Sequence, residues 1–381
     1  MLCIIVVMKR YLYTQILKDL KKMVFITGPR QVGKTFLAKQ IMQEFKNPQY
    51  LNYDNLDDRR IMRGRSWRLN ADLVIFDEIH KMKGWKEFLK GVYDSRPEHQ
   101  ALLVTGSARL ETYRQTGESL AGRYFHLRLN PLSVKEMEGR LSPYDAVEKL
   151  NTLSGFPEPF LSDSVEEAAR WRNQYYTDLI REDIVEFSRI HEVKTMRLLV
   201  ELLRNRIASP LSYKSLAEDL QIAPNTVKKY IQILESLYII FLIRPHHNHI
   251  ARSILKEPKL YFYDSGFVTG DEGVRFENTC AVCLLKHVQY LHDAHGRNSM
   301  LQYIRTKDGK EIDFVIVTDE APEAFIEVKL TDNKPAKALS AFQPRFPNAK
   351  FIQLVHNLHQ EEQKNGIEIA RAGDWLARLA V

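Results

Sequence analysis

The sequence predicts an α/β protein in three parts, and three observations support this prediction. Short apolar runs alternate with stretches of helical periodicity as far as residue 153, which is typical of a doubly wound parallel sheet. Two helical stretches separated by a short turn follow between residues 211 and 237. Two further strand-like runs are joined by a polar turn near residue 320. We therefore expect an α/β domain over residues 1–153, a helical region over 154–255 and a second α/β domain over 256–381.

A glycine-rich stretch directly follows the first apolar run, Met23–Thr27. It reads GPRQVGKT and matches the phosphate-binding pattern G-x-x-x-x-G-K-[ST] of P-loop NTPases. In such a loop the backbone N–H groups and the positive end of the following helix surround a phosphate chain. We expect Lys34 to reach the β- and γ-phosphates and the Thr35 hydroxyl to hold Mg²⁺. The predicted nucleotide-binding residues are Gly28, Pro29, Arg30, Gln31, Val32, Gly33, Lys34, Thr35 and Phe36.

An apolar strand that ends in two acids supports the same site. Residues 73–78 read LVIFDE, so that four apolar residues precede Asp77 and Glu78. A buried parallel strand delivers such carboxylates to the edge of the sheet where α/β proteins bind ligands. We expect Asp77 to hold the Mg²⁺ through water and Glu78 to polarise the attacking water, which predicts hydrolysis as well as binding. Without the glycine-rich loop, the same residues would equally suit a strand that ends in an acidic turn.

Residues that sense or stabilise a γ-phosphate are expected after the next strand. The run Ala101–Val104 is of buried strand type, and Thr105 or Ser107 after it is a candidate γ-phosphate sensor. Either side chain equally suits the cap of a following helix. Arg123 and Arg109 are candidates for an arginine that reaches the phosphates of a neighbouring subunit. Most arginines have surface or structural roles, and that alternative stays open for both.

Composition narrows the class of protein and of partner. The formal charge of +7 at pH 7 favours a polyanionic partner. Three cysteines, an odd number, argue against a disulfide framework and for a reducing compartment, and Cys280 and Cys283 are expected to be core positions of one helix. No stretch approaches the ~20 apolar residues of a membrane span, and Lys9 and Arg10 follow the apolar start instead of preceding it as in a signal peptide. These features predict a cytoplasmic protein without a membrane segment.

The central region contains a predicted helix-turn-helix. SYKSLAEDL and Thr226–Leu237 have amphipathic helical spacing around a short turn, and Ile239–Arg244 is strand-like, which suggests a winged helix. The second helix would expose residue types that meet phosphates and base edges, namely Asn225, Lys228, Lys229 and Gln232. Many such domains bind other proteins or only pack internally, so that DNA contact is one of two open alternatives.

The last region contains a predicted hairpin with acids on one face. Its strands are KEIDFVIV over residues 310–317 and AFIEVK over residues 324–329, with the six-residue turn TDEAPE between them. Asp313 and Glu327 are each seven positions from residue 320, so an antiparallel hairpin centred there places them opposite each other. Lys329 lies two residues after Glu327 and shares its face of the sheet.

This hairpin matches the D…E-x-K core of restriction-type nucleases. Asp313 and Glu327 would bind Mg²⁺, and Lys329 would position or deprotonate a water. Glu277, on a preceding predicted helix, would supply a third oxygen ligand. The alternative is a charged hairpin face without chemistry, and a nuclease core that has lost its activity is also compatible with these residues.

The motifs together resemble a known family. In chain order they are GPRQVGKT, IFDEIH, VTGSARL, LAGR followed by LNPLSVKE, GFPEP, YFYDSGF, EIDFVI and FIEVKL. Over about residues 8 to 370 the chain resembles prokaryotic AAA-type P-loop ATPases that carry a carboxy-terminal restriction-endonuclease-like, PD-(D/E)xK, domain of unassigned function. The resemblance implies binding of ATP with Mg²⁺, hydrolysis of ATP and assembly into a homo-oligomer.

Three functions are compatible with these predictions. The first is an ATPase that acts on or with DNA, in which hydrolysis rearranges the winged-helix and nuclease-like parts. The second is a nucleotide-gated switch whose carboxy-terminal domain docks a protein partner. The third is a metal-dependent DNA nuclease that the ATPase regulates. We favour the first, because the loop and the acidic strand predict hydrolysis and the net charge favours a polyanion.

Overall fold

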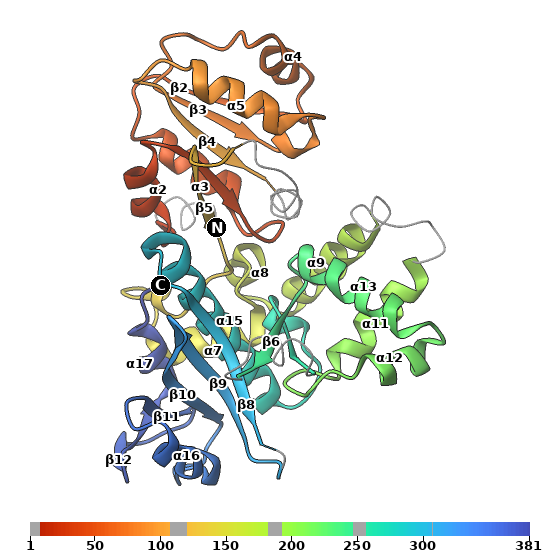
Figure 1. Ribbon diagram of the computed structural model, residues 1–381, viewed down its shortest axis with the longest axis vertical. Helices are drawn as coiled ribbons and strands as arrows, with labels where there is room; N and C mark the ends of the chain where they lie inside the picture. The colour runs from red at the N-terminus through yellow and green to blue at the C-terminus, as the bar shows by residue number, and fades with distance from the viewer. Residues whose placement is uncertain (1–7, 107–119, 182–192, 247–256, 307) are drawn as a thin grey trace. The chain divides into compact units, whose positions relative to one another are not determined.

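The computed structural model of the chain describes residues 8–106, 120–181, 193–246, 257–306 and 308–381 (Figure 1). The candidate sensor Ser107 and the candidate arginine Arg109 lie outside these residues. The chain divides into two compact units. Unit 1 comprises Met1–Asn130 with Ser236–Tyr238, and unit 2 comprises Pro131–Glu235 with Ile239–Val381.

Unit 1 is built on a five-stranded sheet in the order β2-β3-β4-β1-β5. Every neighbouring pair of strands is parallel, which confirms the predicted parallel sheet. The strands are β1 Met23–Thr27, β2 Pro48–Asn52, β3 Leu73–Asp77, β4 Ala101–Thr105 and β5 Tyr124–Arg128. The helices are α2 Tyr13–Asp19, α3 Lys34–Met42, α4 Leu56–Gly64, the 3₁₀ turn η1 Ile79–Lys81, and α5 Trp85–Ser95.

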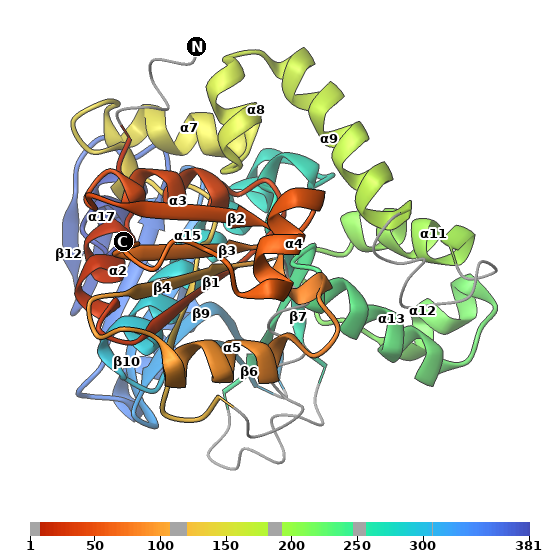
Figure 2. The ribbon, with the colours of Figure 1, turned by 90° about the horizontal axis from the view of Figure 1, so that it is seen from above.

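Helices cover both faces of this sheet (Figure 2). Side chains alternate between the faces of a strand, and Phe76 and Val104 point to the face where Trp85 and Leu89 of α5 pack. Helix α3 contacts β3 and β4 on the other face. The three inner strands β3, β4 and β1 are buried on both faces and are therefore almost wholly apolar, and polar side chains appear where these strands end. The register places Asp77 beside Thr105, so that two of these polar ends meet.

Unit 2 contains an eight-stranded mixed sheet in the order β12-β13-β11-β10-β9-β8-β6-β7. The strands are β6 Ile240–Pro245, β7 Lys259–Phe262, β8 Ser299–Arg305, β9 Glu311–Thr318, β10 Ala321–Lys329, β11 Lys350–Val355, β12 Glu362–Lys364 and β13 Ile367–Arg371. The longest helix is α15, Glu272–His295, and Cys280 and Cys283 are buried, free thiols on it, as the sequence predicts. The other helices are η3 Lys135–Met137, α7 Pro143–Leu153, α8 Pro157–Ser162, α9 Val165–Leu179, α11 Val193–Arg204, α12 Tyr213–Leu220, α13 Pro224–Ser236, η6 Ser265–Phe267, α16 Lys337–Phe342, η7 Gln343–Arg345 and α17 Ala372–Ala377.

The helix pair of the predicted winged helix is present, but the strand after it differs from a wing. Leu216 of α12 and Val227 and Leu234 of α13 are buried, as their spacing predicts. Strand β6 pairs with β7 on one side and with β8 on the other. It is therefore an interior strand of the large sheet. The physical reason is backbone hydrogen bonding, because four of the six residues of β6 are buried and a buried strand needs partners for its N–H and C=O groups along both edges.

The hairpin of β9 and β10 has the predicted register away from its turn. Ile326 lies opposite Phe314, so that Glu327 and Asp313 are the next facing pair, and the Val328 N–H donates to Asp313 Oδ2 at 3.0 Å. The pairing near the turn is offset, and a bulge after Pro322 corrects it. The turn itself is tighter than the predicted six residues, because Asp319 and Glu320 both adopt positive φ.

The predicted end of the first domain at residue 153 stays a prediction. The two compact units divide after Asn130. The reason is packing within unit 2: the fully buried Lys286 of α15 donates to Pro131 O at 3.1 Å and to Ser133 Oγ at 3.0 Å, and it pairs with Glu136. In the part of the chain that the structure describes, no helix has the length and hydropathy that crossing a bilayer requires.

Candidate functional site

The glycine-rich loop of unit 1 needs two of its glycines for geometric reasons. Gly33 immediately precedes α3 with a φ of 98°, in the left-handed region that side chains disfavour. Gly28 has a φ of 142°, and a Cβ added to it would lie 2.2 Å from the carbonyl oxygen of Leu129. The Leu129 N–H in turn donates to Thr27 O at 2.8 Å, and this hydrogen bond holds the Leu129 backbone close to Gly28. The loop is therefore held in one conformation at the amino end of α3.

Lys34 is enclosed by the loop that it follows. Its Nζ donates to Gly28 O at 2.9 Å and to Pro29 O at 2.5 Å, and the residue is only 8% exposed. Burial lowers the pKa of Lys34 to about 8, although the negative charges of Glu78 and Asp77 oppose the shift. A polyanion beside this ammonium group would favour its charged form and so bind more tightly.

Asp77, at the end of β3, is the centre of the polar cluster. Its Oδ2 accepts from Thr35 Oγ1 at 2.8 Å and from the Tyr50 hydroxyl at 2.5 Å. Its Oδ1 accepts from Thr105 Oγ1 and from the Glu78 N–H, the latter at 3.1 Å. The structure thus brings Thr35, Asp77 and Thr105 together as the sequence analysis expects. It adds Tyr50, which lies on the adjacent strand β2 and gave no signal beyond an aromatic residue in a strand.

Glu78 has an unusual backbone conformation for its residue type. Its φ is 55°, in the left-handed region, where a residue other than glycine costs of order 1–3 kcal/mol. Its N–H also donates to Thr105 O at 3.1 Å, which holds this conformation against β4. The carboxylate lies 3.5 Å from both His80 Nε2 and Lys81 Nζ. Burial raises the pKa of Glu78, and Lys81 opposes the shift.

The candidate arginine Arg123 does not contact this cluster within its own chain. It immediately precedes β5, at the opposite edge of the parallel sheet from Asp77. At ~3.3 Å per residue, a strand of five residues separates the two edges by roughly 15 Å. Arg123 forms a two-pronged pair with Asp94, Nε to Oδ1 at 2.7 Å and Nη2 to Oδ2 at 3.1 Å. A role in a neighbouring subunit stays a prediction.

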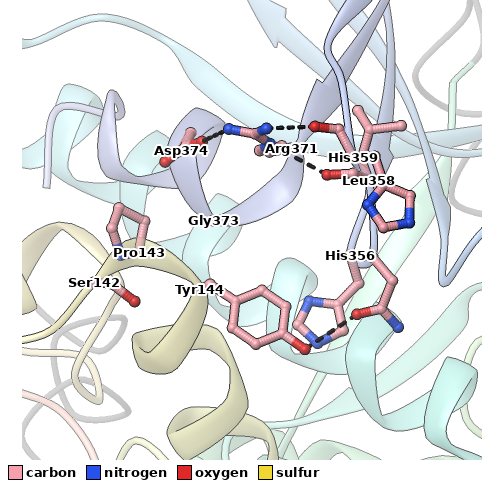
Figure 3. Close-up of a pocket in the computed structure, with 10 residues that line it drawn as sticks. Ser142, Pro143, Tyr144, His356, Leu358, His359, Arg371, Gly373 and Asp374 are labelled. Carbon is pink, nitrogen blue, oxygen red and sulfur yellow. Dashed lines mark hydrogen bonds and ion pairs between the residues drawn. The ribbon is translucent and has the colours of Figure 1, made fainter.

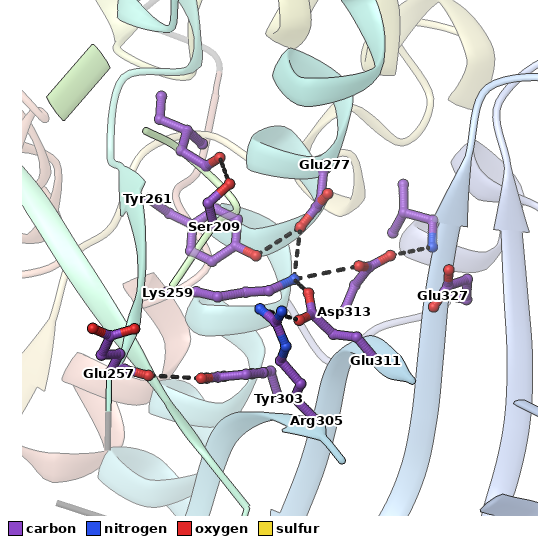
Figure 4. A network of polar contacts seen from close by, with 12 residues as sticks. Ser209, Glu257, Lys259, Tyr261, Glu277, Tyr303, Arg305, Glu311, Asp313 and Glu327 are labelled. Atoms are coloured by element: carbon purple, nitrogen blue, oxygen red, sulfur yellow. Dashed lines mark hydrogen bonds and ion pairs between the residues drawn. The ribbon is translucent and has the colours of Figure 1, made fainter. Parts of the chain in front are cut away.

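The predicted acids of unit 2 surround a lysine that the sequence analysis did not single out (Figure 4). Lys259, the first residue of β7, is 1% exposed, and its Nζ lies 2.7 Å from Glu311 Oε1 and 3.4 Å from Asp313 Oδ1. Glu277 Oε1 lies 3.6 Å from the same nitrogen and accepts from the Tyr261 hydroxyl at 2.7 Å. Burial alone would lower the pKa of Lys259, but the three carboxylates outweigh it and raise the pKa above its ordinary value. We call this group the Lys259 cluster.

The second acid of the predicted nuclease core has an unsatisfied oxygen. Lys329 Nζ donates to Glu327 Oε1 at 2.7 Å, whereas Glu327 Oε2 is buried and has no hydrogen-bond partner among the described residues. Burial, reinforced by Asp313, raises the pKa of Glu327 to about 7, with Lys329 opposing. Burial and Asp313 also raise the pKa of Glu277 to about 8. Negative charge is therefore costly here, as at sites built to receive a cation.

The described residues contain one group of three side chains whose ligand atoms all lie within 4.8 Å of one another: Glu148, Glu272 and His356. His356 stacks on Tyr144 with ring centroids 4.9 Å apart, and its Nε2 bonds to Glu148. Both rings line a cavity of about 470 Å³ (Figure 3). This group is not predictable from the sequence, because its members are far apart in the chain.

The predicted metal ligands Glu277, Asp313 and Glu327 are not gathered into such a group. The reason is visible in the Lys259 cluster, where the Lys259 ammonium lies within 4 Å of both Glu277 and Asp313. The structure therefore places an internal cation where the sequence analysis expects metal ligands to converge.

Comparison with families of known sequence divides the chain into three matched segments. Residues 20–138 match a family described as an AAA domain. Residues 145–273 and 272–374 match two families described as domains of unknown function, DUF8612 and DUF4143. The amino-terminal segment is therefore similar to AAA domains. The expected nuclease-like nature of the carboxy-terminal part stays a prediction.

Similar proteins occur in bacteria and archaea. An uncharacterized protein of Mycobacterium tuberculosis is 26% identical over 251 residues, which are 64% of this chain and 55% of that protein. This chain thus spans little more than half of that relative. The Methanocaldococcus jannaschii protein MJ1544 is 24% identical over 86% of this chain and 80% of its own, and a Haemophilus influenzae protein is 22% identical over 94% and 95%.

Solved structures show a more distant likeness. The Thermotoga maritima RuvB Holliday junction branch migration motor is 18% identical, with a TM-score of 0.31 over 60% of this chain and 84% of that one. The Aeropyrum pernix ORC1 protein in complex with DNA is 13% identical, with a TM-score of 0.33 over 70% and 89%. At these TM-scores the two matches establish no shared arrangement of the whole chains.

Proposed function

We propose that this chain binds ATP with Mg²⁺ at the glycine-rich loop of unit 1, hydrolyses it, and acts on or with DNA. The observation that carries the proposal is the meeting of Thr35 and Asp77 at 2.8 Å directly beside Glu78 and the enclosed Lys34. A structural turn would not need a buried lysine, two constrained glycines and three polar strand ends at one edge of a sheet.

The residues at this edge fit a magnesium ion and a triphosphate. Mg²⁺ prefers hard oxygen ligands, and Thr35 Oγ1 and Asp77 Oδ2 are such oxygens at neighbouring positions. Bound Mg²⁺ would neutralise charge on the β- and γ-phosphates. The N–H groups at the start of α3 and the ammonium of Lys34 supply the remaining positive potential for the phosphate chain.

Glu78 is the residue that we assign to water activation. Its raised pKa, which burial causes, makes the carboxylate a stronger base than an ordinary glutamate. The left-handed backbone at Glu78 directs the carboxylate away from the path that the strand β3 would otherwise follow. Thr105, bonded to Asp77 and to the Glu78 N–H, is the positioning residue that links the γ-phosphate end of the site to β4.

The ATPase proposal is tested by steady-state hydrolysis and by nucleotide binding. Lys34→Ala should lose ATP affinity and turnover, whereas Lys46→Ala, which removes an exposed lysine from the loop after the same helix, should retain both. Glu78→Gln should bind ATP but hydrolyse it about 10²–10⁴-fold more slowly. Equal turnover in Lys34→Ala and wild type would refute the proposed site.

The DNA part of the proposal rests on the exposed face of α13. Asn225, Lys228, Lys229 and Gln232 are all exposed, while the apolar positions between them are buried. Removing two phosphate contacts lowers the slope of log affinity against log salt by roughly two. We therefore expect Lys228→Ala/Lys229→Ala to bind duplex DNA with a correspondingly shallower salt dependence. The control is Lys334→Ala/Lys350→Ala, which removes two exposed lysines elsewhere in unit 2. Absence of DNA binding by the wild type at low salt, with ATP present, would refute this part.

A nucleotide-gated switch is the alternative use of the same site. The exposed pair of Arg123 and Asp94 favours it, because a guanidinium at the surface is available to a second copy of the chain. In that case Glu78→Gln with ATP should increase in size by light scattering without any response to DNA, and Arg123→Ala should abolish the increase. If ATP does not change the size of either variant by light scattering, the nucleotide-gated switch is excluded.

A metal-dependent nuclease is the second candidate function, and the unsatisfied Glu327 Oε2 favours it. Asp313 and Glu327 would hold the metal, and Lys329 would orient the attacking water. Cleavage of plasmid DNA with Mn²⁺ should then be lost in Asp313→Ala and Lys329→Ala and kept in Lys350→Ala. If the plasmid stays intact with every divalent metal tested, Asp313, Glu327 and Lys329 do not form a nuclease site.

A further inference from the structure

Unit 2 contains a second cavity, of about 430 Å³, that none of the proposed activities uses. This volume is within the usual range for small-molecule sites. Its walls come from α9, α11 and the turn that follows β7. Three of its lining residues are arginines, Arg172, Arg197 and Arg204, and we call it the arginine pocket.

Arg172 is locked in place by the motif YFYDSGF, to which the sequence analysis assigns no chemistry. Its Nε donates to Asp264 Oδ2 at 2.8 Å and its Nη2 to Leu153 O at 3.0 Å. Asp264 is fully buried, and its other oxygen accepts from the Gly266 N–H at 3.0 Å. A Cβ on Gly266 would lie 1.9 Å from Arg172 Nη2, so that only glycine leaves room for the guanidinium.

One nitrogen of Arg172 remains for a ligand. The residue lines the cavity, and its Nη1 donates to no acceptor among the described residues. A guanidinium that is fixed in a cavity wall and keeps an open donor is available to a bound acceptor.

Arg204 is held on an aromatic floor. Its guanidinium lies 4.2 Å from the centre of the Phe267 ring, and Phe267 stacks on Tyr176 at 3.7 Å. Its Nε donates to Phe267 O and its Nη1 to Glu201, both at 2.8 Å, which leaves Nη2 without an acceptor in the described chain. Arg197 is exposed and lies seven residues before Arg204 on α11, a spacing that places both on one face of the helix.

The charges of this pocket favour an anion with several oxygens. Asp264 and Glu201 offset two of the three guanidinium groups, so that one positive charge and several open N–H donors remain. Guanidinium groups bind carboxylates and phosphates through paired hydrogen bonds. A carboxylate offers two oxygens, whereas a terminal phosphate offers three, which matches donors from three separate arginines better.

We propose that the arginine pocket of unit 2 binds the phosphate group of a small phosphorylated ligand. Arg172 is the fixed anchor, Arg204 places a second donor above the aromatic floor, and Arg197 closes the charged rim. This site lies in a different unit from the glycine-rich loop and is independent of the ATPase proposal.

The glycine-rich loop of unit 1 would also bind phosphate, so its phosphate binding must first be removed by mutation. Equilibrium dialysis with labelled inorganic phosphate is therefore carried out on the full chain carrying Lys34→Ala. We expect one phosphate per chain, and a loss of affinity of about 10–100-fold when Arg197→Ala is added, because a hydrogen bond to a charged group contributes ~1.5–3 kcal/mol. Arg204→Ala should weaken binding to a similar extent.

The matched control is Arg170→Ala, an exposed arginine on α9 that does not line the pocket. It should leave phosphate affinity unchanged. No phosphate bound by the Lys34→Ala chain, or equal affinity in its Arg197→Ala and Arg170→Ala derivatives, would overturn the proposal. Equally strong competition by acetate would reassign the pocket to carboxylates, and displacement by a short DNA duplex at lower concentration than free phosphate would reassign it to a nucleic-acid backbone.

Discussion

Replacing Lys259 by methionine tests whether the acids of unit 2 depend on an internal ammonium group. Methionine keeps an unbranched side chain of similar reach and removes the charge. In the wild type, Lys259 Nζ lies 2.7 Å from Glu311 and 3.4 Å from Asp313. A third carboxylate, that of Glu277, lies 3.6 Å away, and the lysine side chain is 1% exposed.

The expected magnitude follows from this burial. Removing one partner from a buried ion pair costs about 3–5 kcal/mol, because the remaining charges stay buried without compensation. We therefore expect Lys259→Met to lower the free energy of unfolding of unit 2 by about that amount at pH ~8. The loss should be smaller at pH ~6, because Glu277, whose pKa is about 8, is largely protonated there.

The sign of the pH effect follows from the raised pKa of Glu277, about 8 in the wild type. The folded state keeps a proton that the unfolded chain releases above its pKa of ~4.3, so stability falls as pH rises through this window. Lys259 at present lowers the pKa of Glu277. Without it, the folded-state pKa rises and the decline in stability extends to higher pH.

The assay is hydrogen exchange of peptides from β9 and β10, corrected for the intrinsic exchange rate at each pH. Lys310→Met is the control, because Lys310 is 54% exposed and adjoins the same strand. Equal protection in Lys259→Met and Lys310→Met at pH ~8 would refute the reasoning. If the cluster can hold a metal, added Mn²⁺ should restore protection in Lys259→Met more than it affects the wild type.

Three further outcomes are expected. Gly28→Ala should weaken ATP binding at least about tenfold in a fluorescent-nucleotide titration, because its Cβ would meet Leu129 O at 2.2 Å, whereas Gly64→Ala on α4 should not. Gly266→Ala should abolish phosphate binding in the arginine pocket while circular dichroism stays unchanged. Glu235→Gln should stabilise the protein to thermal unfolding more at pH ~8 than at pH ~5, since burial raises the pKa of Glu235 to about 7 and its ionisation above that pH opposes folding. An equal shift at both pH values would contradict this.

Local patterns in the sequence predicted the parts of the fold that depend on neighbours in the chain. The glycine-rich loop, the acids after β3 and the pairing of Asp313 with Glu327 all follow from spacing along one or two strands. Strand β6 could not be placed from sequence, because its partners β7 and β8 begin 14 or more residues further along the chain and no tight turn joins it to either of them. A predicted wing became part of a large sheet for that reason.

Tyr50 and Lys259 are the two site residues that the sequence did not predict, and the physical reason is the same for both. Tyr50 reaches Asp77 only because β2 lies beside β3, and Lys259 reaches Glu277 and Asp313 only because β7, α15 and β9 converge. A lysine that opens an apolar strand was visible in the sequence, but its partners lie up to 54 residues away. The separation of such charge pairs along the sequence follows no fixed pattern, so their partners cannot be predicted from sequence alone.

The contacts of the buried Lys286 limit where this polypeptide can be divided for separate expression. The segment that matches the AAA domain runs to residue 138, yet the acceptors of Lys286 are Pro131, Ser133 and Glu136. A carboxy-terminal fragment that starts at residue 139 would carry a fully enclosed ammonium group stripped of its counter-charge and of both oxygen acceptors. A carboxy-terminal fragment that starts at Pro131 keeps all three acceptors of Lys286 in the same chain, and it also retains Ser236–Tyr238, which belong to unit 1.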